Sequence, residues 1–129
     1  DFDISVTVAS DNHVRKLNRE WRDVSKATDV LSFPLHEYLQ PGTIPPTLDG
    51  TKDLGDIVLG AQYIERYCRK HQIVCLQSYL ARLVVHGTCH LLGYTHDCDT
   101  DHEQMIRQEK SIIQVLKEQD EQFQYHWND

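Results

Sequence analysis

Three histidines between residues 86 and 96 have the spacing of a metal site. His86 and His90 are four residues apart, so on a helix their imidazoles lie one turn apart on the same face. Gly93 allows the chain to turn back after the helix, which brings His96 toward the same point. Three neutral imidazoles that leave a fourth position for water are typical of a catalytic zinc site. The segment therefore predicts one zinc ion per chain, held by these three histidines.

Ordinary core histidines are the alternative, because a single histidine on an apolar helix face is usually a hydrogen-bonded core residue. Apolar residues cover most sides of the helix expected here, which indicates a buried central helix: Leu80, Ala81, Leu83, Val84, Val85, Cys89, Leu91 and Leu92. Burying unpaired imidazoles there would cost about 1 to 3 kcal/mol each, and metal ligation removes that cost. Cys98 is a further candidate ligand, but a fourth protein ligand would close the position of the water.

Hydrolysis is the reaction class expected of such a site. Bound zinc lowers the pKa of its water from about 15.7 to about 7 and polarises a substrate oxygen. The segment matches the metzincin protease pattern H-E-x-x-H-x-x-G-x-x-H except at Gly87, which stands where those proteases have their general base. The missing glutamate argues against peptide hydrolysis. Gly87 either leaves room beside the ion or permits close helix packing, and the sequence favours neither explanation.

Strands and helices are expected to alternate in a single α/β domain of 129 residues. The patterns predict strands over 3–9, 28–33 and 54–59, and helices over 11–22, 60–71, 75–92 and from 100 onward. Thr100 and Glu103 fit a capping box for the last helix. The residues expected to face inward are Val14, Leu17 and Trp21 in the first helix and Met105, Ile112, Ile113 and Leu116 in the last. Residues 35–53 are predicted to form a long irregular loop, and such loops are often functional.

Four separated blocks resemble, in the right order, the YbeY-type metal-dependent endoribonucleases, also called rRNA maturation factors. The blocks are Leu17-Asn18 with Arg22, the TDVLSFP run at 28–34, the LGDI run at 54–57, and the histidine segment. This resemblance covers nearly the whole chain. It implies an α/β fold with a small mixed sheet packed by helices, zinc on the three histidines, and single-strand-specific cleavage of ribosomal RNA during small-subunit maturation. It also implies a catalytic role for the arginine at position 22.

The chain departs from the family pattern in two places. Thr95 stands where the family often has aspartate before the last histidine, and the usual family chain has more sequence ahead of its first strand here. Part of the N-terminal region of the family domain is therefore expected to lie outside residues 1–129. Cys89 and the run 33–37 are more similar to organellar members, which favours a mitochondrial or other organellar matrix, with a bacterial-type cytoplasm as the alternative. The four cysteines are expected to be reduced thiols.

Arg22 also has an independent physical argument. Arg15, Arg19 and Arg22 are spaced i, i+4 and i+7, so they form a basic strip on one helix face. For Arg15 and Arg19 an ordinary solvated face is the favoured explanation, with RNA contact as the alternative. A guanidinium can hold two phosphate oxygens and stabilise transition-state charge, so Arg22 is proposed as the anion clamp.

Two carboxylates are weaker candidates for orienting the ligand imidazoles. Asp56 lies at a predicted strand and Asp97 adjoins His96, and a metal-bound histidine commonly needs such a hydrogen-bond partner. For Asp97 a turn or cap carboxylate is the favoured explanation.

Net charge limits the kind of partner. The chain is at −7, and residues 86–129 contribute most of this, with nine acidic and three basic side chains. Proteins that bind RNA through phosphate contacts are usually basic, so weak, salt-sensitive binding of free RNA is expected. A ribosomal protein, the small ribosomal subunit or one of its assembly intermediates would then supply much of the binding to precursor rRNA. No stretch approaches 18 continuous apolar residues, so no membrane partner is expected. A zinc peptidase and a non-catalytic ribosome-assembly factor are the alternative functions.

Overall fold

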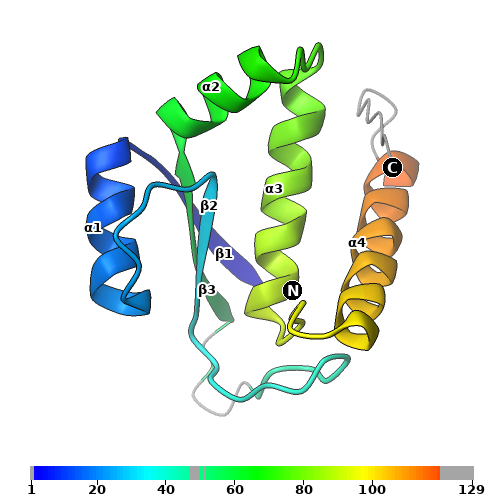
Figure 1. Ribbon diagram of the computed structural model, residues 1–129. Coiled ribbons are helices and arrows are strands. Elements are labelled where there is room, and N and C mark those ends of the chain that lie inside the picture. Colours follow the sequence, from blue (N-terminus) through cyan, green and yellow to red (C-terminus); the bar gives the residue numbers. More distant parts are fainter. Residues whose placement is uncertain (1, 47–49, 51, 120–129) are drawn as a thin grey trace.

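The described part of the computed structural model contains three strands and four helices (Figure 1). The structure describes residues 2–46, 50 and 52–119. Its elements are β1 (Asp3–Ala9), α1 (Asp11–Arg22), β2 (Val30–Pro34), β3 (Asp53–Gly60), α2 (Ala61–Lys70), α3 (Leu76–Leu91) and α4 (Asp99–Gln119). They do not alternate strictly as expected, because β2 and β3 follow each other directly and three helices come after them. Each predicted strand and helix is confirmed, with starts and ends that differ slightly from the predicted ones.

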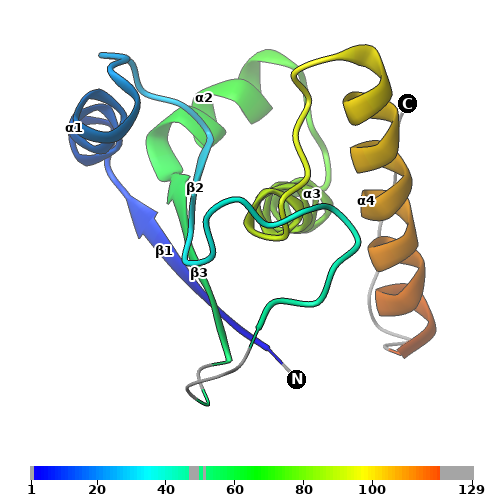
Figure 2. The same ribbon diagram turned by 90° about the horizontal axis from the view of Figure 1, so that it is seen from below.

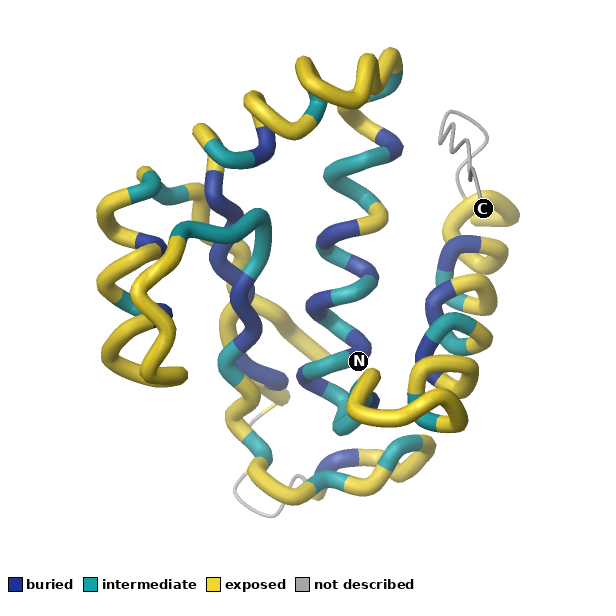
Figure 3. Tube along the Cα trace, viewed as in Figure 1, coloured by how far each residue is buried: buried dark blue, intermediate teal, exposed yellow. Residues whose placement is uncertain are grey.

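The three strands form one mixed sheet in the order β1-β3-β2. β1 runs parallel to β3, whereas β2 runs antiparallel to it. The α/β fold with a small mixed sheet is therefore confirmed. A strand's burial depends on its place in the sheet. The central strand β3 is buried along most of its length, and the edge strand β1 is almost wholly exposed (Figure 3).

Helices α1 and α3 cover opposite faces of this sheet. Successive side chains of a strand point to opposite faces, and β3 follows that rule. Val58 packs with Val14 of α1, whereas Ile57 and Leu59 belong to a separate cluster that contains Leu83 of α3. Helix α4 lies on the side of α3 away from the sheet, so α3 is the central helix of the molecule, as predicted (Figure 2).

Local hydrogen bonds hold α1 and the segment that follows it in place. The Ser10 side chain accepts from the His13 amide and caps the helix start. At the other end, Asp23 has a left-handed backbone with φ of 58°. The buried Asn18 side chain then donates to the Lys26 carbonyl at 3.0 Å. These contacts turn the chain from α1 toward β2, and they fix Arg22 at the end of the helix.

Three details of the predicted helices are wrong. Trp21 is 70% exposed and does not face the core, because it lies over β2 with its ring edge-on to Phe33 at 6.2 Å. Leu116 is 36% exposed, because the buried stripe of α4 runs through Met105 and Ile113 without reaching this last turn. Thr100 lies inside the first turn of α4, since the helix begins at Asp99, so it is not the capping residue.

The described residues of the predicted loop, 35–46, 50 and 52, contain no helix or strand. This segment passes beneath the end of α3 in the view of Figure 1. Among the described helices, none combines the length and the apolar character that a membrane crossing needs.

Candidate metal centre

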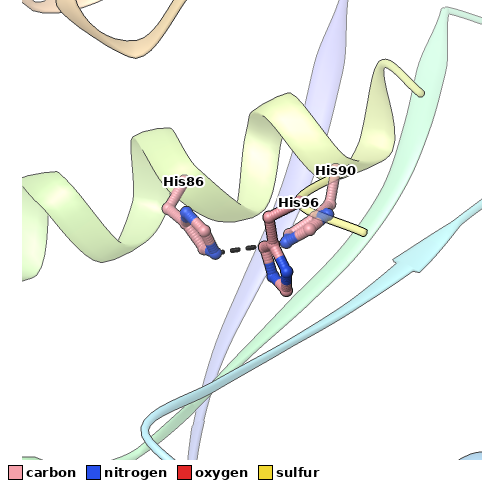
Figure 4. Close-up of side chains that lie close together, drawn as sticks. All are labelled: His86, His90 and His96. Atoms are coloured by element: carbon pink, nitrogen blue, oxygen red, sulfur yellow. Dashed lines mark hydrogen bonds between the residues drawn. The ribbon is translucent and has the colours of Figure 1, made fainter. Parts of the chain in front are cut away.

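The structure brings His86, His90 and His96 together. One ring nitrogen from each of the three lies within 4.8 Å of those of the other two. His86 and His90 occupy successive turns near the end of α3, and His96 comes from the segment between α3 and α4 (Figure 4). Within the described residues, this is the one group of histidine, cysteine or acidic side chains close enough to hold a metal ion. Cys98 is exposed and lies outside it.

The turn that returns His96 to the helix depends on Gly93. Its φ is +93°, and an added Cβ would collide with the Leu39 carbonyl oxygen of the loop. The backbone amide of Tyr94 donates to the Cys89 carbonyl at 3.0 Å, which closes the helix end. The Tyr94 side chain is buried in a cluster with Cys89. The turn is thus held by a glycine, a loop and a core aromatic.

Both helical imidazoles have partners that fix their tautomers. His86 Nδ1 lies 2.7 Å from Oε1 of Glu109, a residue of α4 that is 5% exposed. His90 Nδ1 lies 3.0 Å from the Tyr94 carbonyl oxygen. A carboxylate and a carbonyl accept hydrogen bonds, so each Nδ1 carries the proton and each Nε2 carries a lone pair.

The two Nε2 atoms lie only 3.1 Å apart, as marked by the dashed line in Figure 4. When each Nδ1 donates its proton to its own acceptor, the two Nε2 atoms are the ring nitrogens that a cation can use. The donor set therefore fits a metal ion, with hydrogen-bonded imidazoles of the kind that metal sites use.

Burial keeps His90 neutral. Loss of solvation, followed by the nearby His86, lowers the pKa of His90 to about 4. The positive charge of Arg22 also contributes to this shift, which places the arginine within electrostatic reach of the site. Metal binding requires a deprotonated imidazole, so His90 is ready to ligate at neutral pH. Burial raises the pKa of the neighbouring Cys89 to about 12, so this residue stays a neutral core thiol.

Gly87 permits close packing of α3 on the sheet. A Cβ at this position would lie 3.0 Å from Ser32 Oγ and 3.1 Å from Ile57 Cδ1. The Ser32 hydroxyl also donates to the Gly87 carbonyl at 3.2 Å. Of the two explanations that the sequence left open, the structure supports packing, because position 87 faces β2 and β3.

Two clefts border the helical histidines, one lined by His90 and the other by His86. The larger, here called the α1 cleft, has a volume of about 1020 Å³ and is lined by Trp21, Arg22, Phe33, Tyr38, Asp56 and His90, among others. The smaller, here called the α4 cleft, has a volume of about 530 Å³ and is lined by Asp29, Tyr67, Tyr79, Arg82, His86 and Glu109, among others. One helical histidine thus faces each cleft.

The predicted site residues separate into two groups. Arg22 lines the α1 cleft, and its Nη2 donates to the Ser32 carbonyl at 3.0 Å. Asp56 lines the same cleft. Arg15 and Arg19 are exposed on α1 outside both clefts, and Asp97 is exposed outside them as well. A role for Asp56 or Asp97 in orienting an imidazole stays a prediction, since the partners of His86 and His90 are other groups.

Sequence reasoning missed Glu109. A signal was present, because this acidic residue interrupts the apolar stripe of the last helix between Met105 and Ile113. A buried carboxylate on such a stripe requires a partner, and His86 is that partner. The second missed group, the Tyr94 carbonyl, belongs to the backbone and leaves no trace in the residue type.

Comparisons with known proteins agree with this geometry. The family model described as "Endoribonuclease YbeY" matches residues 1–117. The chain is 37% identical over 116 residues to a Homo sapiens protein of that name, covering 89% of this chain and 68% of the relative. It is 38% identical over 114 residues to the Agrobacterium fabrum protein of the same name, covering 88% and 64%. The chain thus spans about two thirds of the length of these two relatives.

Among solved structures, the chain is similar to the solution structure of TM1509 from Thermotoga maritima. The TM-score is 0.50 at 20% sequence identity, and the match covers 100% of this chain and 80% of the other. At this identity the likeness concerns the fold, and it agrees with the small mixed sheet and its helices.

Proposed function

The chain belongs to the endoribonuclease YbeY family, and we propose that it is a metal-dependent endoribonuclease that cleaves single-stranded RNA. We further propose that its substrate is precursor rRNA, in the maturation of the small ribosomal subunit. The observation that carries the proposal is the convergence of three imidazoles, in which the Nε2 atoms of His86 and His90 lie 3.1 Å apart. His86 lines one cleft and His90 lines the other, and we propose that an extended strand passes from one cleft to the other across the histidines.

Zinc is the metal that we propose for this site, with His86, His90 and His96 as its ligands. Three imidazole nitrogens are a donor set that suits zinc. A bound zinc ion supplies an activated water and polarises a phosphoryl oxygen. The protein supplies the orientation of the ligands, through Glu109 behind His86 and the Tyr94 carbonyl behind His90.

Arg22 is the proposed clamp on the cleaved phosphate. Its guanidinium lines the α1 cleft, and the bond to the Ser32 carbonyl holds it against β2. A guanidinium has further N–H donors beyond the one used there, and these can hold phosphate oxygens bidentately. Asp56 lines the same cleft and is proposed to help place the substrate or a ligand, while Arg15 and Arg19 contribute at most a diffuse positive field.

Net charge favours a bound partner over free RNA. At −7, the chain repels phosphates outside the site itself. We therefore propose that a ribosomal protein or an assembly intermediate of the small subunit brings the RNA to the clefts. An organellar matrix stays the favoured location, with a bacterial-type cytoplasm as the alternative. A peptidase is disfavoured, because the position of the protease general base is Gly87, which faces the sheet.

The direct test is the sequencing of RNA termini before and after incubation of zinc-loaded protein with single-stranded and duplex rRNA fragments. New internal termini in the single-stranded fragments, absent with the His90→Ala variant, are expected. Gln77 is exposed on the same helix and lines neither cleft, so Gln77→Ala provides the matched control. Equal cleavage by wild type and by a folded His90→Ala variant would contradict the proposal.

A further inference from the structure

The α4 cleft has an aromatic wall that the proposed chemistry does not use. Tyr67 of α2 and Tyr79 of α3 stack with ring centroids 5.3 Å apart and an interplanar angle of 14°. His71 lies against Tyr67 at 4.2 Å, so the tyrosine belongs to a series of three rings. Tyr67 is 36% exposed and lines the cleft together with Tyr79. Tyr79 and His71 already cover part of the Tyr67 ring, so a ligand in the cleft can contact the exposed remainder of the ring. Exposed aromatic rings are what proteins use to hold unpaired nucleobases.

Tyr79 is held in one orientation. Its hydroxyl donates to the Asp29 carboxylate at 3.3 Å, and burial raises the pKa of Tyr79 well above its usual value. The side chain therefore stays neutral and keeps this hydrogen bond. A fixed ring loses little conformational freedom when a ligand stacks on it, which makes the wall suitable for binding.

The charges in the cleft favour a neutral ring over a phosphate. Two carboxylates line it, Asp29 and Glu109, and they are already bonded to Tyr79 and His86. The basic residue is Arg82, one turn before His86 on α3, and His102 lies on the α4 side. The net charge of the residues that line the cleft is therefore not positive, whereas a site that binds phosphates is usually positive. A heterocyclic base can contact the tyrosine rings with its flat surface and can form hydrogen bonds to these polar groups with its edges.

We propose that the α4 cleft binds the base of one unpaired nucleotide next to the cleaved phosphodiester. The inference rests on the proposed function, since it places the strand across the histidines from the α1 cleft into the α4 cleft. The volume of about 530 Å³ lies within the range of about 300–1,000 Å³ that small-molecule sites occupy. A base in a duplex is stacked and paired and cannot enter, so the cleft also gives a physical reason for single-strand specificity.

The test is a double-mutant cycle between Tyr67 and the base. Short single-stranded RNAs, each with one abasic position, are compared with the intact RNA for wild type, Tyr67→Ala and Tyr67→Phe. Binding is measured by fluorescence anisotropy in EDTA, which keeps the RNA whole, and cleavage is measured separately with zinc. Tyr63→Ala is the matched control, because Tyr63 lies one turn earlier on α2 and lines neither cleft.

We expect one abasic position to weaken binding and to raise KM by about 5- to 100-fold in wild type, the usual worth of one stacked base. Tyr67→Ala should weaken the binding of intact RNA by a similar factor. In this variant the abasic position should cause no further loss of binding. Tyr67→Phe and Tyr63→Ala should behave as wild type. Additive penalties, or a Tyr67→Phe loss equal to that of Tyr67→Ala, would overturn the subsite and favour a protein ligand in the cleft. Tyr67-dependent base binding without any cleavage by wild type would instead overturn the proposed function and leave the subsite standing.

Discussion

The α1 cleft and the α4 cleft differ in what they can hold. The α1 cleft is about twice as large and contains Arg22, whose charge reaches His90. The α4 cleft contains stacked tyrosines and a carboxylate that is bonded to His86. The first is thus suited to an anion and the second to an aromatic ring.

The same contrast extends to the two helical imidazoles. His90, beside the α1 cleft, is fixed by a backbone carbonyl, whereas His86, beside the α4 cleft, is fixed by a charged side chain from another helix. Substitutions can therefore remove one kind of support without the other. The proposed anion clamp Arg22 and the charged partner of His86 thus lie in different clefts beside the histidine group.

Loss of a shared ligand should disable both sides at once. We expect His90→Ala, or removal of metal with a chelator, to reduce RNA cleavage by at least about 10³-fold, because a bound metal contributes several kcal/mol of transition-state stabilisation. Cleavage is measured by denaturing gel, with circular dichroism to confirm that the variant is folded. Restoration by zinc in the chelated wild type, and its failure in the variant, would separate metal loss from unfolding.

Arg22→Ala should affect the α1 side alone. We expect a decrease in kcat of about 10² to 10³-fold, the usual effect of removing one preorganised donor from a developing anion. Zinc content should stay at one per chain, as measured by atomic absorption. Arg15→Ala, on the same helix but outside both clefts, should cleave as wild type. Normal cleavage by zinc-loaded Arg22→Ala would refute the clamp.

The two clefts also differ in how far the sequence predicted them. Arg22, the histidines and Gly93 all follow from local spacing, because helix periodicity and a turn glycine are short-range properties. The elements and the mixed sheet followed from hydrophobic patterns and from the family resemblance.

The α4 cleft was not predicted, because Tyr67, Tyr79 and Glu109 come from three different helices. Which helix faces meet depends on tertiary packing, and no local pattern encodes it. Trp21 shows the same limit, since helix periodicity placed it in the core while the structure leaves it exposed against Phe33. Residue spacing thus predicted the histidine group that the structure brings together, and only the assembled fold showed which groups are hydrogen-bonded to His86 and His90.

Glu109→Gln tests whether the charge of Glu109 strengthens His86 as a metal ligand. The amide can still accept the hydrogen bond from His86 Nδ1, but it removes the negative charge that makes the imidazole a stronger ligand. We expect zinc affinity to fall by about 10- to 100-fold, measured by competition with a chelator. Glu103→Gln, an exposed change on the same helix, is the control and should leave the affinity unchanged. If the zinc affinity of Glu109→Gln is unaltered, Glu109 contributes to packing and not to metal binding.

The smallest expected effect concerns the stability of the metal-free protein in acid. Burial lowers the pKa of His90 to about 4, whereas an unfolded histidine titrates near 6.5. Between these values the unfolded chain binds more protons, so the free energy of unfolding should fall as the pH decreases from about 6.5 to about 4. Denaturant titrations of wild type and His90→Gln across this window measure the difference. The variant lacks the titrating group, so its stability should depend less steeply on pH, and equal slopes would show that His90 is not held neutral by its surroundings.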